Sequence, residues 1–249
     1  MTPRGTLTAL GLIACACLGE SGLAASFQDD MAQRTLACTA CHGNQGRAGP
    51  DGYYPRLAGK PAGYLYNQLR NFQEGRRHYG LMTRMVGSLS DAYLHDIARH
   101  FGSLELPYPP PASSTDVPPE KLASGRRLVQ EGDPSRGVPA CIQCHGHTLT
   151  GVTPNIPGLV GLPRDYLNAQ LGGWRVGDRR ARAPDCMATI VQRMNADDIS
   201  SVSAWLASQT VPTPAHPSSA LPVPTAVANR PHIDLPCGSA PELASGGRP

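Results

Sequence analysis

Apolar side chains recur at helical spacing in separate stretches of this chain. Leu65, Leu69 and Phe72 follow one another at intervals of four and three residues, as on the buried face of an α-helix. Ile97 and Phe101 mark a second such stripe. No alternating run of apolar and polar residues is long enough to predict a strand. The pattern therefore predicts an all-α fold, with short helices separated by segments rich in Gly and Pro.

Two of the predicted helices carry clear start signals. Ser90 precedes the first and Asp91 stands in its first turn, where the helix dipole favours an anion. Asn195 has the same place before the helix that carries Ile199 and Val202. We expect both residues to act as N-caps.

The chain repeats itself at a period of about 103 residues, from "CTACHG" (38–43) to "CIQCHG" (141–146). Such self-similarity is typical of a tandem duplication, in which each copy is one structural unit. Each unit should hold roughly three to five short helices. The matched residues downstream are Pro55, Leu57, Gly59, Tyr64, Leu65, Gln68, Leu69, Phe72 and Gly75 in the first copy and Pro157, Leu159, Gly161, Tyr166, Leu167, Gln170, Leu171, Trp174 and Gly177 in the second.

Composition and repeat together divide the chain into segments. We expect a signal peptide at 1–25, a first domain at 26–106, a Pro-rich connector at 107–117 and a second domain at 118–211. The tail, 212–249, is rich in Pro, Ser and Ala and lacks periodicity, so we expect it to be disordered or draped over the surface.

The overall charge and composition exclude some classes of function. The formal net charge is +3, without a block of like charge, which indicates neither nucleic-acid binding nor a polybasic membrane patch. Aromatic residues make up only 5% of the chain, so a large apolar cofactor would help to fill the core.

The N-terminus predicts export to the periplasm. One Arg precedes a short apolar run, and small residues follow, with cleavage expected after Ala24 or Ala25. Alternatively, "LIAC" resembles a lipoprotein cleavage site that would leave Cys15 as a lipid anchor. Either way, the remaining cysteines function in an oxidising compartment, where disulfides are common.

The two C-x-x-C-H units admit three chemistries. A redox dithiol usually needs a βαβ setting, which the pattern does not show. Zinc needs four ligands, and the two units could share one ion only if each were half a site. Covalent haem attachment requires two cysteines for thioether bonds and an adjacent histidine for the iron, and it occurs outside the cytoplasm. Two such units in an exported chain therefore predict two haem c groups.

The histidines of these units are the predicted proximal iron ligands, His42 and His145. A ligating histidine generally donates its other N–H to a backbone carbonyl, for which Pro55 and Pro157 are the candidates. His147 lies two residues beyond a ligand and cannot reach the opposite face, so we interpret it as a surface residue.

A methionine is the expected sixth ligand, because its thioether favours ferrous iron. Met82 and Met187 lie 40 and 42 residues after their histidines, at matching places in the repeat. Met85 and Met194 lie nearby but do not match each other in register, and core packing is their simpler role. His78 is a further possibility in the first copy only.

These features resemble those of dihaem cytochrome c4: two C-x-x-C-H units, a "P-x-L-x-G…YL-x-x-QL" run and an "M-x-x-M…LSD" run, over about residues 33–208. The second copy departs from the pattern with "MNADD" in place of "LSD". The resemblance implies two class I cytochrome c domains with His/Met-ligated haems. The implied site residues are Cys38, Cys41, His42 and Met82 for the first haem and Cys141, Cys144, His145 and Met187 for the second.

The expected function is therefore electron transfer and not catalysis. The carrier would relay single electrons between redox partners, for example toward a terminal oxidase. A dihaem peroxidase, with one open haem, is an alternative, and a dedicated subunit of a dehydrogenase or oxidase is another. Two cysteines lie outside the haem units, Cys186 and Cys237, and either form a disulfide that pins the tail or are unrelated thiols.

Overall fold

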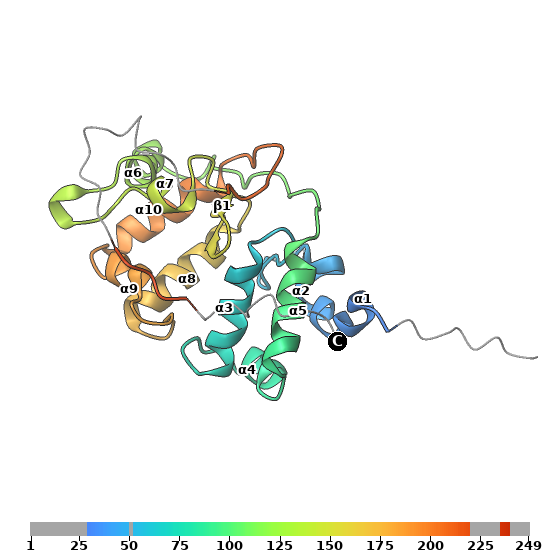
Figure 1. Cartoon of the computed structure of the whole chain (residues 1–249). Coiled ribbons are helices and arrows are strands. Elements are labelled where there is room, and N and C mark those ends of the chain that lie inside the picture. The colour runs from blue at the N-terminus through green and yellow to red at the C-terminus, as the bar shows by residue number, and fades with distance from the viewer. Residues whose placement is uncertain (1–28, 50–51, 220–234, 240–249) are drawn as a thin grey trace, which may run out of the picture.

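A computed structural model of the chain describes residues 29–49, 52–219 and 235–239. The predicted signal peptide and Cys15 lie outside these residues. The described part is mainly helical and forms two similar halves that lie side by side, which confirms the predicted all-α class (Figure 1). None of its helices is long and apolar enough to cross a bilayer. The first half holds α1 (Met31–Arg34), α2 (Leu36–His42), the 3-10 turn η1 (Asn44–Gly46), α3 (Ala62–Gln73), α4 (Gly80–Val86) and α5 (Asp91–Gly102), and the second holds α6 (Pro119–Gln130), η2 (Pro134–Arg136), α7 (Ile142–His145), α8 (Arg164–Val176), α9 (Cys186–Val191) and α10 (Ala196–Ala207).

The first half is built on the packing of α3 against α5. The stripes that the sequence predicts supply buried side chains, including Leu65 and Phe72 from α3 and Ile97 and Phe101 from α5. Ser90 caps α5 as predicted, because its hydroxyl oxygen accepts a hydrogen bond from a backbone N–H of the first turn at 3.3 Å.

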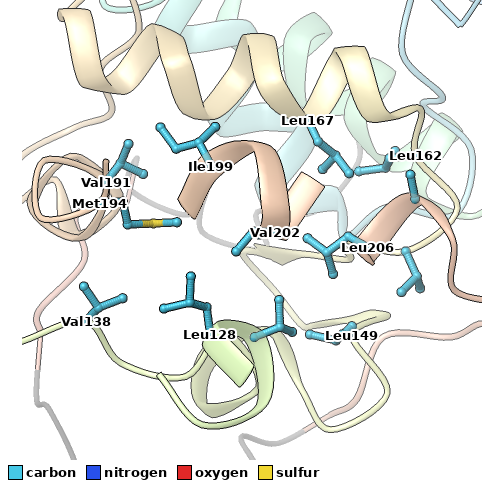
Figure 2. Packing of buried hydrophobic residues seen from close by; sticks show 13 residues of the cluster. Leu128, Val138, Leu149, Leu162, Leu167, Val191, Met194, Ile199, Val202 and Leu206 are labelled. Atoms are coloured by element: carbon cyan, nitrogen blue, oxygen red, sulfur yellow. The ribbon is translucent and has the colours of Figure 1, made fainter. Parts of the chain in front are cut away.

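The second half places α10 across α6 and α8. Figure 2 shows side chains from these helices converging on one core, with Met194 beside Val191. Asn195 caps α10 as predicted, and Asp198 completes a capping box: Asp198 N lies 2.8 Å from Asn195 Oδ1, and Asn195 N lies 2.9 Å from Asp198 Oδ2.

A small sheet in the second half was not expected from the sequence. Strands β1 (Gly151–Val152) and β2 (Ile156–Pro157) pair antiparallel, with Val152 opposite Ile156. Two residues are too few for an alternating pattern to show, so the pairing follows from the tight turn between them.

The connector is attached to the first half through Arg56. This side chain is 3% exposed and donates hydrogen bonds to the carbonyl oxygens of Ala58 at 3.0 Å and Pro107 at 2.9 Å. Its guanidinium carbon lies 3.9 Å from the centroid of the Tyr108 ring. The start of the connector is thus fixed by a buried cation and a stacked ring.

Two pieces of the tail lie within the described residues, 212–219 and 235–239. The first piece extends the small sheet: Ser218 N donates to Gly151 O, and Thr153 N donates to Ser218 O, both at 2.9 Å. The second piece is joined to α9 by a disulfide between Cys186 and Cys237. The structure thus confirms the disulfide hypothesis for the two cysteines outside the haem units.

Candidate haem-binding sites

Each C-x-x-C-H unit coincides with the end of a short helix whose last residue is the histidine: α2 ends at His42 and α7 at His145, with Cys141 as the N-cap of α7. The glycine that follows has a positive φ in both halves, 75° at Gly43 and 84° at Gly146. A Cβ on Gly43 would lie 2.3 Å from the carbonyl oxygen of Ala48. Glycine is therefore required for the turn that ends the helix at the histidine.

Both histidine rings are oriented by the carbonyl predicted for them. Nδ1 of His42 lies 2.8 Å from Pro55 O, and Nδ1 of His145 lies 2.7 Å from Pro157 O. A carbonyl oxygen only accepts, so Nδ1 carries the proton and Nε2 is left as the donor for a metal. Burial lowers the pKa of both imidazoles, which favours the neutral form that coordinates iron.

The cysteine environments argue against the dithiol and zinc interpretations. Burial raises the pKa of Cys38, and it raises the pKa of Cys141 to about 12, whereas a redox thiol needs a lowered pKa. The four cysteines of the two units are not joined to each other. Among the described residues no cluster of three or more His, Cys, Asp and Glu could hold a metal ion, so the units do not come together as a zinc site.

A cavity of about 560 Å³ lies in the second half next to the α7 unit. Cys141, Cys144 and His145 line it, as do Met187 of α9 and Met194. Its size is within the range of cofactor pockets, and its wall is mostly apolar. One apolar cavity thus contains two cysteines that could form thioether bonds, a neutral imidazole and the thioether of a methionine. This set of groups fits a covalently bound haem.

The alternative iron ligands lie in different environments. Met85 is 41% exposed, and His78 and His147 are also exposed. Met194 is 5% exposed and packs in the core of the second half, although it also reaches the cavity wall. Met82 is half-buried and packs against the core of the first half. Met187 is likewise half-buried and packs against the core of the second half, and it also lines the cavity.

A hydrogen-bonded ring joins the two halves. Arg77 donates to Gln68 Oε1 at 3.0 Å and to Gln170 Oε1 at 2.6 Å. Arg179 donates to Gln170 Oε1 at 2.7 Å and to Gln68 Oε1 at 3.1 Å. The members are two pairs of matching residues in the repeat, so the interface has approximate twofold symmetry. Backbone pairing of Arg77 with Arg179 extends it.

These guanidinium groups also stack on aromatic rings. The Arg77 carbon lies 4.6 Å from the Phe72 centroid, and that of Arg179 lies 3.7 Å from the Trp174 centroid. Within the described parts of the chain, neither arginine forms an ion pair with a carboxylate. Both cations are therefore held at the interface by neutral partners.

Lys60 is a buried cation that the sequence did not single out. It is 7% exposed, lines the cavity of the second half, and burial lowers its pKa to about 8. Among the residues that the structure describes, its ammonium forms no ion pair with a carboxylate. A buried charge without an ion pair is costly, so an anionic group such as a haem propionate fits this position.

Asp185 is a second residue that sequence reasoning missed. Its carboxylate accepts hydrogen bonds from Ala188 N at 3.0 Å, Ala181 N at 2.6 Å and Trp174 Nε1 at 3.3 Å. It thereby caps α9 immediately before Cys186 and Met187. An Asp before a short apolar run is an N-cap signal, and it could have been found on that ground.

Comparisons with known proteins agree with this geometry. No family model matches the chain. The thiosulfate dehydrogenase electron acceptor of Thiomonas intermedia is 39% identical over 176 residues, which cover 70% of this chain and 78% of the relative. Cytochrome c4 of Pseudomonas aeruginosa is 33% identical over 193 residues, which cover 76% of this chain and 92% of the relative.

Solved structures give the same result. Reduced cytochrome c4 from Pseudomonas stutzeri matches with a TM-score of 0.61 and 28% identity, over 72% of this chain and 96% of the other. Thiosulfate dehydrogenase (TsdBA) from Marichromatium purpuratum matches with a TM-score of 0.62 and 31% identity; the match covers 71% of this chain but only 39% of the other. On the strength of these relatives, the chain belongs to the cytochrome c4 family of dihaem electron-transfer proteins.

Proposed function

We propose that the protein is a periplasmic carrier of single electrons with two covalently attached haem c groups, each bound by one histidine and one methionine. The observation that carries this proposal is the repeated arrangement of a buried histidine, its Nδ1 on a proline carbonyl, behind a pair of cysteines. The proposed residues are Cys38, Cys41, His42 and Met82 for the first haem and Cys141, Cys144, His145 and Met187 for the second.

The protein groups would act by positioning and by closing the iron to substrates. Bound haem would supply a one-electron couple at each site. The proline carbonyls hold the imidazole rings in one orientation, and the cysteines would bind the haem covalently. Met82 and Met187 would take the remaining position, which suits a carrier and leaves no place for a peroxide. The relatives named as electron carriers likewise favour this function over a peroxidase.

The expected donor is a thiosulfate dehydrogenase. Two relatives are named as electron acceptors of that enzyme, from Thiomonas intermedia and Stutzerimonas stutzeri. Electrons would pass onward to a terminal oxidase through small, transient contacts. A permanent complex with the dehydrogenase is the second candidate, favoured by the likeness to part of the TsdBA structure.

Periplasmic location is supported by three features of the chain. The predicted signal peptide would export it, and the disulfide between Cys186 and Cys237 suits an oxidising compartment. Attachment of haem to C-x-x-C-H units also takes place after export.

Visible spectroscopy and site-directed variants test the proposal. A pyridine haemochrome assay should give two haems per chain, and the ferric protein should show a methionine–iron charge-transfer band without a high-spin signal. Met82→His and Met187→His should each remove part of that band, whereas Met85→Leu and Met194→Leu, the matched controls, should retain it. Loss of the band in Met194→Leu would instead assign the ligand to Met194. A high-spin haem that reacts with peroxide would contradict a carrier function.

The partner is tested separately by stopped-flow reduction. A thiosulfate dehydrogenase supplied with thiosulfate should reduce the protein, and thiosulfate alone should not. Absence of reduction would exclude this donor and leave the carrier function intact.

A further inference from the structure

The two methionine-bearing helices begin in different ways. In the first half, α4 follows Tyr79, whose side chain makes no capping hydrogen bond. In the second half, α9 follows Asp185, which caps the helix and also holds Ala181 and Trp174. The matched methionines, Met82 and Met187, thus lie in helices whose first turns are held to different extents.

The C-terminal segment 235–239 adds a second restraint to the Met187 loop, which we define as residues 182–187; these lead into α9 and include its first two residues. The disulfide joins Cys237 to Cys186, the residue directly before Met187. Next to it, Gly238 N donates to Pro184 O at 2.8 Å. Figure 1 shows this red segment running beside α9. One covalent bond to Cys186 and one backbone hydrogen bond to Pro184 therefore join the segment to the loop immediately before Met187.

The close approach of this segment depends on glycine. A Cβ on Gly238 would lie 2.3 Å from Arg182 O and 2.4 Å from Ala183 O. No side chain could move to relieve such contacts, because both atoms belong to the backbone. The segment thus lies flat on the loop that precedes α9.

The segment also reaches the cavity and the first half. Cys237, Gly238 and Ser239 line the same cavity as Met187. Asn67 of α3 donates from Nδ2 to Ser239 Oγ at 3.0 Å. We name residues 235–239, with their disulfide, the C-terminal clamp. It extends from the Met187 loop to a helix of the other half.

We propose that the C-terminal clamp is a positioning element that keeps the Met187 thioether on the second haem iron and makes this haem resistant to ligand exchange. The inference rests on the proposed His/Met ligation. An external ligand can bind only when the methionine moves away, and that requires a local opening of its loop. A cross-link restricts such open states, because it removes conformational freedom from them. Met82 has no matching clamp among the described residues, so the first haem should exchange its ligand more readily.

Imidazole titration of the ferric protein tests the proposal. Met82→His leaves only the second haem with a methionine, and Met187→His leaves only the first. Each background is compared with and without the paired change Cys186→Ser and Cys237→Ser in the full-length chain. In the M82H background, removal of the clamp should strengthen imidazole binding about 10-fold to 100-fold, the usual effect of removing an outer support of a metal ligand. In the M187H background, the affinity should not change.

Three results would overturn the proposal. An unchanged affinity in the M82H background would show that the clamp does not hold the ligand. An equal rise in both backgrounds would show a general loosening of the protein. A wild-type protein without a methionine–iron band would refute the proposed ligation itself, and the clamp with it, so the two failures are distinguishable.

A chemical version of the test does not depend on the folding of any variant. The native protein is treated with dithiothreitol, alkylated with iodoacetamide, desalted and reoxidised with ferricyanide. Cleavage of the disulfide should weaken the methionine–iron band at lower imidazole concentrations than in the untreated protein. A matched sample alkylated without reductant should behave as the native protein does. Identical titrations of all three samples would contradict the proposal.

Discussion

The crossing of α6 and α10 depends on Gly125, and replacing this glycine by alanine should destabilise the second half. A Cβ at this position would lie 2.1 Å from Ser201 O and 2.6 Å from Ser201 C. It would also lie 2.9 Å from Trp205 Cβ. The nearest atoms are backbone atoms of α10, so no rotamer change can make room and the helices must separate.

The net effect follows from two opposing contributions. Alanine in place of a helical glycine lowers the free energy of the helix by about 1 kcal/mol. Over-packing of a helix contact costs about 1–3 kcal/mol, and a backbone clash belongs at the upper end of that range. Gly125→Ala should therefore destabilise the protein by about 2 kcal/mol. At about 2–4 °C per kcal/mol, the Tm should fall by about 4–8 °C.

Gly172→Ala is the matched control, because Gly172 lies in α8 and a Cβ there would meet no atom within 4 Å. This variant should gain about 0.5–1 kcal/mol from helix propensity alone. Thermal unfolding followed by far-UV circular dichroism, with haem content checked in parallel, measures both variants. A Tm of Gly125→Ala equal to or above that of the wild type would refute the packing argument.

Further predictions concern buried charges and the interface. Lys60→Leu should lower the reduction potential of the second haem, because a buried cation favours the ferrous state. The expected shift is about 59 mV, the one-electron equivalent of a tenfold change in the equilibrium constant. Spectroelectrochemistry measures the potential, and an unchanged value would contradict the prediction. Hydrogen bonds, above all from Ser135, lower the pKa of Asp133 from 3.8 to about 2, so its stabilisation is present above pH 3.8 and is lost as the pH falls to about 2. In Asp133→Asn, thermal unfolding should show a smaller loss of stability over this pH range. Gln170→Leu should cost about 1–3 kcal/mol, because two guanidinium groups lose an acceptor; a denaturant titration with an unchanged midpoint would argue against it.

Local signals in the sequence predicted the helices and their starts. The spacing of Leu65 and Phe72 identified the buried face of α3, and the N-caps Ser90 and Asn195 were both found where expected. These features depend on residues only a few positions apart, so the sequence contains the whole interaction. The same holds for Pro55, whose carbonyl lies a short loop away from its histidine.

Contacts between the halves could not be predicted in the same way. Gln68 and Gln170 are visible in the sequence as a repeated pair. The sequence does not show that each side-chain oxygen accepts hydrogen bonds from two arginines, one from each half. Burial of Lys60 is equally hidden, because it depends on the position of the other half. The small sheet and the tail contacts arise from loops whose partners are fixed only in three dimensions.

The duplicated structure suggests where a functional difference between the two haems would arise. The histidines are oriented by the same contact in both halves, and the glutamine–arginine ring contacts both halves symmetrically. We therefore expect neither feature to make the reduction potentials of the two haems different. Lys60 and the C-terminal clamp, in contrast, both lie against the cavity of the second half. A buried cation and a firmly held thioether each favour ferrous iron. We therefore expect the second haem to have the higher potential, so that electrons entering at the first haem move on to the second.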